Sequence, residues 1–191
     1  DVVINTATQY LQSYLNDHAN IFGWLTIDYN KDNCDDIVAL GYATWSTLYT
    51  NDCSWGLTPT DLLPSRWFDG GIKADFNNDG RDDIIGVWRV SPSRYYTNLS
   101  GAGFSSWLDI WNYGSIWWSA ADFNNDGYID VMLNGRQWRN DALLFNTWWT
   151  WFVLSQRRDY RQSINGGSAD FNKDGWMDSI AVTRWYPYVR R

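Results

Sequence analysis

One acidic heptapeptide occurs four times in this sequence of 191 residues, and it constrains the fold more than any other feature. It reads ADFNNDG at residues 74–80 and 121–127, ADFNKDG at 169–175, and IDYNKDN at 27–33. The first aspartates of successive copies are 47, 47 and 48 residues apart, and each copy continues to a further Asp eight residues later. The shared pattern is D-x-N-x-D-G-x-x-D, and a regular period of this length indicates a chain built from repeated structural units.

Each acidic loop is followed by a short apolar run that is typical of a β-strand. The four runs read IVAL, IIGV, VMLN and SIAV. A later run in three of the units ends at Asn51, Asn98 or Asn146, which lie 15, 15 and 16 residues after the last loop aspartate. We therefore predict the order strand, acidic loop, strand, turn, strand, turn, strand in each unit. A unit of four short strands and this length has the size of a propeller blade.

We therefore predict an all-β fold, a β-propeller-type array of about four four-stranded blades of about 47 residues, in one repeat domain over residues 1–191. Residues 1–17 align without gaps on residues 36–52, and the last unit has about one strand after its loop, so the chain is expected to start and end in mid-blade. Three ways to complete the ring stay open: closure with four blades, pairing with a second copy, or continuation in a longer protein. The predicted units are approximately 1–20 (partial), 21–67, 68–114, 115–162 and 163–191 (partial).

The conserved spacing within the four loops indicates a metal site. Positions 1, 3, 5 and 9 are Asp, Asn, Asp and Asp in every copy, and position 7 can offer a backbone carbonyl. Hard oxygen donors without His or Cys are typical of calcium sites rather than zinc or copper sites. Position 6 is Gly in three copies and Asn33 in the first, which suits a positive φ. Crowded carboxylates repel one another without a cation, so we expect about four Ca²⁺ ions to stabilise the chain.

The loops have two other possible interpretations. The first six positions match an EF-hand loop, but an EF-hand needs a bidentate Glu at position 12 and flanking helices. Position 12 is here Ala39, Gly86, Leu133 or Ala181, and strands are expected to follow, so an EF-hand is excluded. The second alternative is a set of Asx-turns that hold hairpins together without metal.

With the stretch YYTNLSGAGF at residues 95–104, the loop pattern resembles the FG-GAP/VCBS repeats of integrin-α-type and of fungal and bacterial lectin-type propellers. The resemblance implies a propeller whose loops bind Ca²⁺ between the strands of each blade. The heavy Trp content and the low number of units depart from the family pattern. The ligands that it implies are Asp28, Asn30, Asp32, Asp36 and the Cys34 carbonyl; Asp75, Asn77, Asp79, Asp83 and the Arg81 carbonyl; Asp122, Asn124, Asp126, Asp130 and the Tyr128 carbonyl; and Asp170, Asn172, Asp174, Asp178 and the Trp176 carbonyl.

Charge and composition exclude several classes of function. The net charge of −7 argues against nucleic acid as a partner, and no stretch has the length of a membrane span. The single histidine, His18, lies in a polar segment without a nucleophile motif, so we predict that the chain is not an enzyme.

Cysteine usage indicates a secreted protein or one at the extracellular surface. Cys34 and Cys53 are equidistant from a turn expected at residues 43–44, which makes a disulfide geometrically plausible. The alternative is two unpaired, partly buried thiols. The sequon Asn98-Leu99-Ser100 makes Asn98 a candidate glycosylation site.

The aromatic residues suggest what a calcium-stabilised scaffold of this kind would bind. Trp24 and Trp118 occupy matching positions four residues before a loop aspartate, where the other units have Gly. With Trp117 they are candidates for stacking on sugar rings at grooves between blades; the alternative is that they fill space between blades. Together with the resemblance, they predict a non-enzymatic, carbohydrate-binding, lectin-like protein. The rival hypothesis is a structural or adhesion component whose exposed Trp residues bind protein partners.

Overall fold

The part of the chain that the computed structural model describes consists of β-strands and their connecting loops. The strands form three four-stranded sheets and one two-stranded sheet, and each strand pairs antiparallel with its neighbour in sequence. The described residues are 21–41, 45–54, 56–63, 68–90, 92–105, 108–111, 115–135, 141–148, 151–158 and 162–184.

The sheets follow one another along the chain. The first contains β1 (Ile21–Ile27), β2 (Asp36–Gly41), β3 (Ser46–Asn51) and β4 (Leu57–Leu63). The second contains β5 (Gly70–Ala74), β6 (Asp83–Val87), β7 (Ser93–Tyr96) and β8 (Leu108–Trp111). The third contains β9 (Ser115–Ala121), β10 (Asp130–Gly135), β11 (Asp141–Thr147) and β12 (Trp151–Arg158). The fourth contains β13 (Gln162–Ala169) and β14 (Asp178–Arg184).

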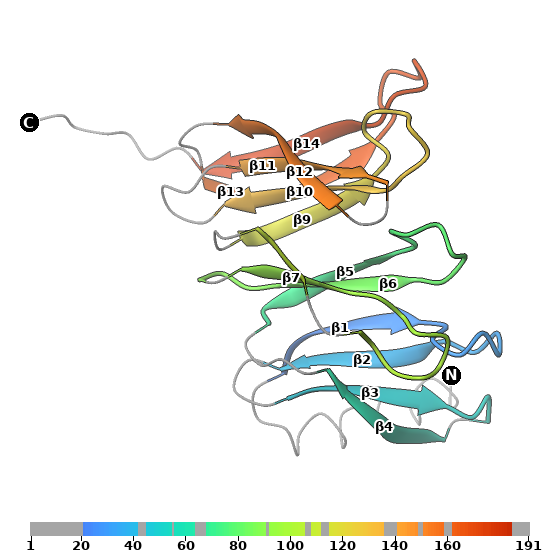
Figure 1. Cartoon of the computed structure of the whole chain (residues 1–191). Helices are drawn as coiled ribbons and strands as arrows, with labels where there is room; N and C mark the ends of the chain where they lie inside the picture. The colour runs from blue at the N-terminus through green and yellow to red at the C-terminus, as the bar shows by residue number, and fades with distance from the viewer. Residues whose placement is uncertain are drawn as a thin grey trace, which may run out of the picture.

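The sheets are stacked face to face, as Figure 1 shows. The first strand of each sheet contacts the first strand of the next, so that β1 contacts β5, β5 contacts β9 and β9 contacts β13. The all-β prediction is confirmed, and three sheets have the predicted four strands. The described sheets form an open stack and no closed ring. The strands predicted within residues 1–17 lie outside the described residues.

Two apolar layers hold the first three sheets together. Strand β6 contributes to both, because successive side chains of a strand point to opposite faces. Ile84 packs with Ile27, Val38 and Leu40 of the first sheet. Its neighbour Ile85 packs in the other layer, with partners that include Val131, Leu133 and Leu144 of the third sheet. This explains the continuous apolar run of β6, where every residue is buried.

Two glycines permit close packing between the sheets. A Cβ on Gly86 would lie 2.4 Å from the ring of Phe68, and a Cβ on Gly70 would lie 2.2 Å from the ring of Trp118. Side chains at either position would collide with these rings, so Phe68 and Trp118 lie directly against backbone.

The fourth sheet exposes a face that is buried in the second. Phe171, Ile180 and Val182 are 54%, 49% and 51% exposed. The residues at the same repeat positions in the second sheet are Phe76, Ile85 and Val87, and all three are fully buried. An apolar face of the fourth sheet is therefore accessible.

Candidate metal-binding loops

The four acidic loops occupy equivalent places in the four sheets. They join β1 to β2, β5 to β6, β9 to β10 and β13 to β14, and all four lie on the right-hand side of the stack in Figure 1. The fold thus brings the predicted ligand residues of each copy into one loop and places the loops in a row. They span residues 28–36, 75–83, 122–130 and 170–178.

The loop side chains hold the loop backbone in one repeated form. In the second loop, Asp75 Oδ1 accepts the amide hydrogen of Asp79 at 3.0 Å, and Asp75 Oδ2 accepts that of Gly80 at 2.7 Å. Asn77 Oδ1 also accepts the amide hydrogen of Asp79, and Asp79 Oδ1 accepts that of Arg81 at 2.9 Å. The corresponding bonds occur in the other three loops. The Asx-turns of the metal-free alternative are therefore present.

Each loop contains two positions with positive φ. Position 6 has φ of 66° at Asn33 and 80–89° at the three glycines, as predicted. Position 4 also has positive φ in every loop, at 55–62°, which the sequence pattern did not predict. The residues there are Lys31, Asn78, Asn125 and Lys173; only Asn is well suited to this conformation.

The aspartate at position 9 joins the loop to the third strand of its sheet. Asp130 Oδ2 accepts the amide hydrogen of Phe123 at 2.9 Å, and its Oδ1 accepts that of Asn146 at 2.8 Å. Asp36 makes the same two bonds in the first sheet, to Tyr29 and Asn51. Asp83 accepts from the amide of Asn98 and from the Tyr95 hydroxyl. This explains the fixed spacing between the last loop aspartate and the strand-ending Asn.

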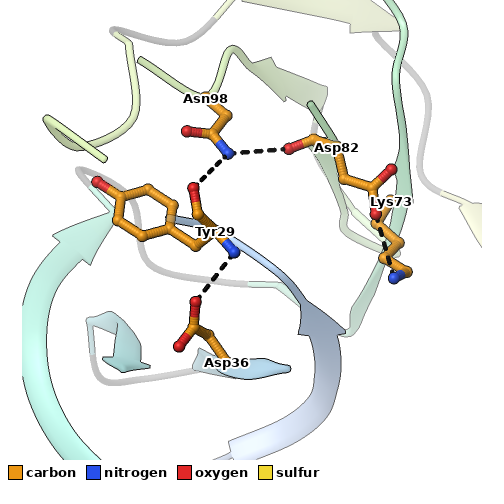
Figure 2. Close-up of polar contacts among 5 residues, drawn as sticks. All are labelled: Tyr29, Asp36, Lys73, Asp82 and Asn98. Carbon is orange, nitrogen blue, oxygen red and sulfur yellow. Dashed lines mark hydrogen bonds and ion pairs between the residues drawn. The ribbon is translucent and has the colours of Figure 1, made fainter. Parts of the chain in front are cut away.

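Two of these Asn side chains, those of Asn98 and Asn146, join neighbouring sheets. Asn98 Nδ2 donates to the backbone carbonyl of Tyr29 in the first sheet at 3.1 Å and to the carbonyl of Asp82 in its own sheet at 3.4 Å (Figure 2). Asn146 Nδ2 donates in the same way to the carbonyls of Phe76 and Ile129. Figure 2 also shows the amide of Tyr29 donating to Asp36. Tyr29 therefore bonds to its own loop through its amide and to the second sheet through its carbonyl.

Burial perturbs the carboxylates at position 9. Desolvation raises the pKa of Asp83 and the pKa of Asp130 to about 6, although hydrogen bonds to both groups oppose the shift. Desolvation also raises the pKa of Asp36. In all three, the other two loop aspartates raise the pKa further. A nearby cation would oppose both effects.

The residues of the loops fit calcium by donor chemistry. Every side-chain donor is a hard oxygen, and an ionised carboxylate has about four acceptor sites, of which the hydrogen bonds above use about half. Among the described residues, the only acidic or thiol trio with ligand atoms within 4.8 Å of one another is Asp32, Cys34 and Cys53, and the two sulfur atoms of this trio are bonded together. No described loop therefore brings one oxygen from each of its aspartates at positions 1, 5 and 9 to within 4.8 Å of one another.

Without metal, stability is expected to fall as pH rises from about 4 to about 6. Asp83 and Asp130 have a pKa of about 6 in the folded chain and an ordinary pKa of 3.8 when unfolded, so the folded chain binds more protons than the unfolded chain in this window. Protonation of each carboxyl stabilises the fold by about 1–3 kcal/mol, where the lower value allows for solvent screening. This stabilisation is complete below pH ~4 and is lost above pH ~6. Urea denaturation in chelator at several pH values measures it. Asp83→Asn with Asp130→Asn should flatten the profile, and a wild-type profile that rises through this window would contradict the prediction.

A disulfide joins the first loop to the end of its third strand. Cys34 and Cys53 are bonded, with their Cα atoms 5.6 Å apart and a sequence separation of 19. Closing a loop of this length is worth about 3 kcal/mol through the unfolded state. Cys34→Ser with Cys53→Ser is expected to lower the free energy of unfolding by about that amount, measured by urea denaturation. An unchanged free energy would show that the bond does not stabilise the fold.

The predicted sugar-stacking residues differ in their surroundings. Trp118 packs against the core between the second and third sheets and lies over Gly70, so it fills space between sheets. Trp24 in β1 is 65% exposed and is available to a ligand. Trp117 lies in β9 opposite Asn134, and its side chain is outside the described part of the chain, as is His18.

The structure contradicts the predicted glycosylation of Asn98. This side chain is only 2% exposed, and the nitrogen that would carry a glycan donates to two backbone carbonyls. A glycan would break the contact between the first and second sheets. The recurrence of this Asn at a fixed distance from the last loop aspartate was the sequence signal for its structural role, which the sequon obscured.

Comparison with known proteins supports the assignment of the repeat. Residues 75–133, which include the second and third loops, match the family described as FG-GAP-like repeat. No curated protein matches the sequence. Among solved structures, the chain is similar to the crystal structure of the V. cholerae biofilm matrix protein Bap1, with 18% identity and a TM-score of 0.47. The match covers 85% of this chain and 28% of that one. No helix among the described residues has the length and apolar character to cross a membrane.

Proposed function

The chain contains an FG-GAP-like repeat, and on this premise we propose that it is a calcium-stabilised, non-enzymatic binding protein of the extracellular space. In this proposal the stacked sheets are blades of a β-propeller, and about four Ca²⁺ ions occupy the loops. The observation that carries it is the aspartate at position 9 of the first three loops, which is buried, accepts a hydrogen bond from the segment at the third strand, and has a raised pKa. The disulfide supports an oxidising location.

When bound, calcium would supply positive charge to carboxylates that otherwise repel one another. The residues that would hold it are the Asp and Asn side chains at positions 1, 3, 5 and 9 and the carbonyl at position 7. The hydrogen bonds within each loop hold its backbone in one conformation before any ion arrives, which reduces the entropy that binding must overcome.

The ligand that we propose is a carbohydrate, bound between blades by exposed aromatic rings. Trp24 supports this proposal because most of its indole is accessible, and flat aromatic faces suit the apolar face of a sugar ring. A glycan array in calcium tests it, with Trp24→Ala expected to weaken binding and Trp148→Ala, another exposed indole, as the matched control. If no glycan bound in calcium, the carbohydrate proposal would be wrong while the calcium proposal would stand.

Protein assembly is the second candidate function, and the accessible face of the fourth sheet favours it. Phe171, Ile180 and Val182 form an apolar surface at positions that the following sheet covers elsewhere. A second copy, another protein partner or a further part of a longer chain could cover it. Sedimentation equilibrium tests self-association: Phe171→Ser with Ile180→Ser should weaken it, whereas Val90→Ser, an equally exposed residue elsewhere, should not. A wild-type chain that stays monomeric throughout the micromolar range would exclude self-assembly through this face.

A further inference from the structure

Side chains at position 4 connect each acidic loop to the next one. Asn78 Nδ2, in the second loop, donates to the backbone carbonyl of Gly127 in the third loop at 3.1 Å. Asn125 Nδ2, in the third loop, donates to the carbonyl of Gly175 in the fourth loop, also at 3.1 Å. The donor is at position 4 and the acceptor at position 6 in both cases, so the two bonds repeat one geometry.

The first and second loops are neighbours in the same sense, with a different residue. Lys31 occupies position 4 of the first loop, and its ammonium nitrogen would lie 3.3 Å from a Cβ placed on Gly80, at position 6 of the second. The side chain at position 4 therefore reaches position 6 of the next loop at all three junctions. Only the second and third loops use a neutral amide.

The donor and the acceptor of each bond lie in loop segments whose conformation a bound ion would hold. Asn78 and Asn125 have φ of 56° and 55°, a conformation held by the loop's own carboxylate and amide bonds. The acceptor carbonyl belongs to the peptide that leads into position 7, whose own carbonyl is the backbone ligand of the proposed site. Ordering one loop therefore holds in place the peptide that directly precedes the backbone ligand of the next loop.

We propose that Asn78 and Asn125 are positioning residues that couple neighbouring calcium loops, so that an ion in one loop raises the affinity of the next. This inference rests on the proposed calcium function. Because coupling between binding sites is reciprocal, an ion in the fourth loop also raises the affinity of the third. At the first junction, the positive charge of Lys31 next to the second loop opposes an ion there, and coupling is weaker.

Trp176 makes the fourth loop separately observable. It is at position 7 of that loop, so an indole lies beside this site, whereas the other loops have Cys34, Arg81 and Tyr128 there. Tb³⁺ has a calcium-like preference for hard oxygen ligands, and its luminescence is sensitised by a nearby indole. Titration of the full chain with Tb³⁺, excited through Trp, reports occupancy of the fourth loop, and Trp176→Phe should remove this signal.

The test combines two substitutions in the third loop. Asn125→Gly removes the amide and tolerates the positive φ, and it is expected to lower the Tb³⁺ affinity of the fourth loop roughly threefold to tenfold, the size of one net hydrogen bond. Asp126→Asn weakens the third loop as an ion site. As a single substitution, Asp126→Asn should lower the Tb³⁺ affinity of the fourth loop. In a chain that already has Asn125→Gly, it should have no further effect on that affinity. Asn78→Gly, one junction earlier, should shift the signal less.

The outcomes separate the two proposals. The coupling proposal would be wrong if Asn125→Gly left the fourth-loop affinity unchanged, or if Asp126→Asn had the same effect with and without Asn125. The proposal of calcium sites would stand in either case. If the wild-type chain gave no Trp-sensitised emission that Ca²⁺ displaces, the calcium proposal itself would fail. Urea denaturation of each variant in chelator shows whether it folds, and Asn125→Gln, which keeps an amide, should retain part of the coupling.

Discussion

Removing calcium is expected to lower the melting temperature by more than about 10 °C. At calcium concentrations about 10–100 times the dissociation constant, each site stabilises the folded state by about 1.4–2.7 kcal/mol. Four such loops would contribute about 6–11 kcal/mol, and each kcal/mol shifts the midpoint of a chain this long by about 2–4 °C. The physical cause is the loss of positive charge from four loops that each contain three or four aspartates.

Calorimetry in calcium and in chelator measures this shift. Magnesium at equal concentration is the control, and it should restore less stability because it resists replacing its water ligands with a protein loop. Asp75→Asn with Asp79→Asn should reduce the shift by about one quarter, since one of the four loops is changed. Identical midpoints in calcium and chelator would contradict the expectation.

Replacing Asn146 by Ala is expected to lower the free energy of unfolding by about 2–6 kcal/mol. The side chain is fully buried, and its amide donates at 2.6 Å to the Phe76 carbonyl of the neighbouring sheet and at 3.3 Å to the Ile129 carbonyl of its own. Each buried carbonyl left without a donor costs about 1–3 kcal/mol. Urea denaturation in the presence of calcium measures the loss.

Asn51 provides a matched control for this substitution. It ends the third strand of the first sheet as Asn146 ends that of the third, but it is partly exposed. Its amide donates to the Asp35 carbonyl of its own sheet, and the described residues show no bond from it to another sheet. Asn51→Ala should therefore cost about 1 kcal/mol. Equal losses for the two variants would show that the inter-sheet bond is not what stabilises Asn146.

Local sequence signals predicted the strands and loops because these features depend on nearby residues. The run IIGV alone marks β6, and D-x-N-x-D-G fixes a turn whose bonds all form within seven residues. Position 4 was missed because Lys31 and Lys173 give no sign of a left-handed conformation. That conformation is imposed by bonds from the flanking carboxylates to the loop amides.

Contacts between sheets could not be read from the repeat. Trp24 and Trp118 occupy the same repeat position, but one is exposed and the other lies over Gly70. The difference depends on which sheet faces each of them, which no local pattern specifies. The sequon at Asn98 misled for the same reason, since its burial comes from the neighbouring sheet. Whether the stack closes into a ring likewise depends on contacts between distant segments.

Counting the bound ions tests the calcium account most directly. The chain, equilibrated in calcium and dialysed against a buffer of known free calcium, should retain about four ions per molecule by elemental analysis, one for each acidic loop. Replacing the aspartates at positions 1 and 5 of a single loop by Asn should lower this number by one. A wild-type chain that retained no calcium at millimolar free concentrations, with its sheets intact, would show that the loops are hydrogen-bonded turns without a metal.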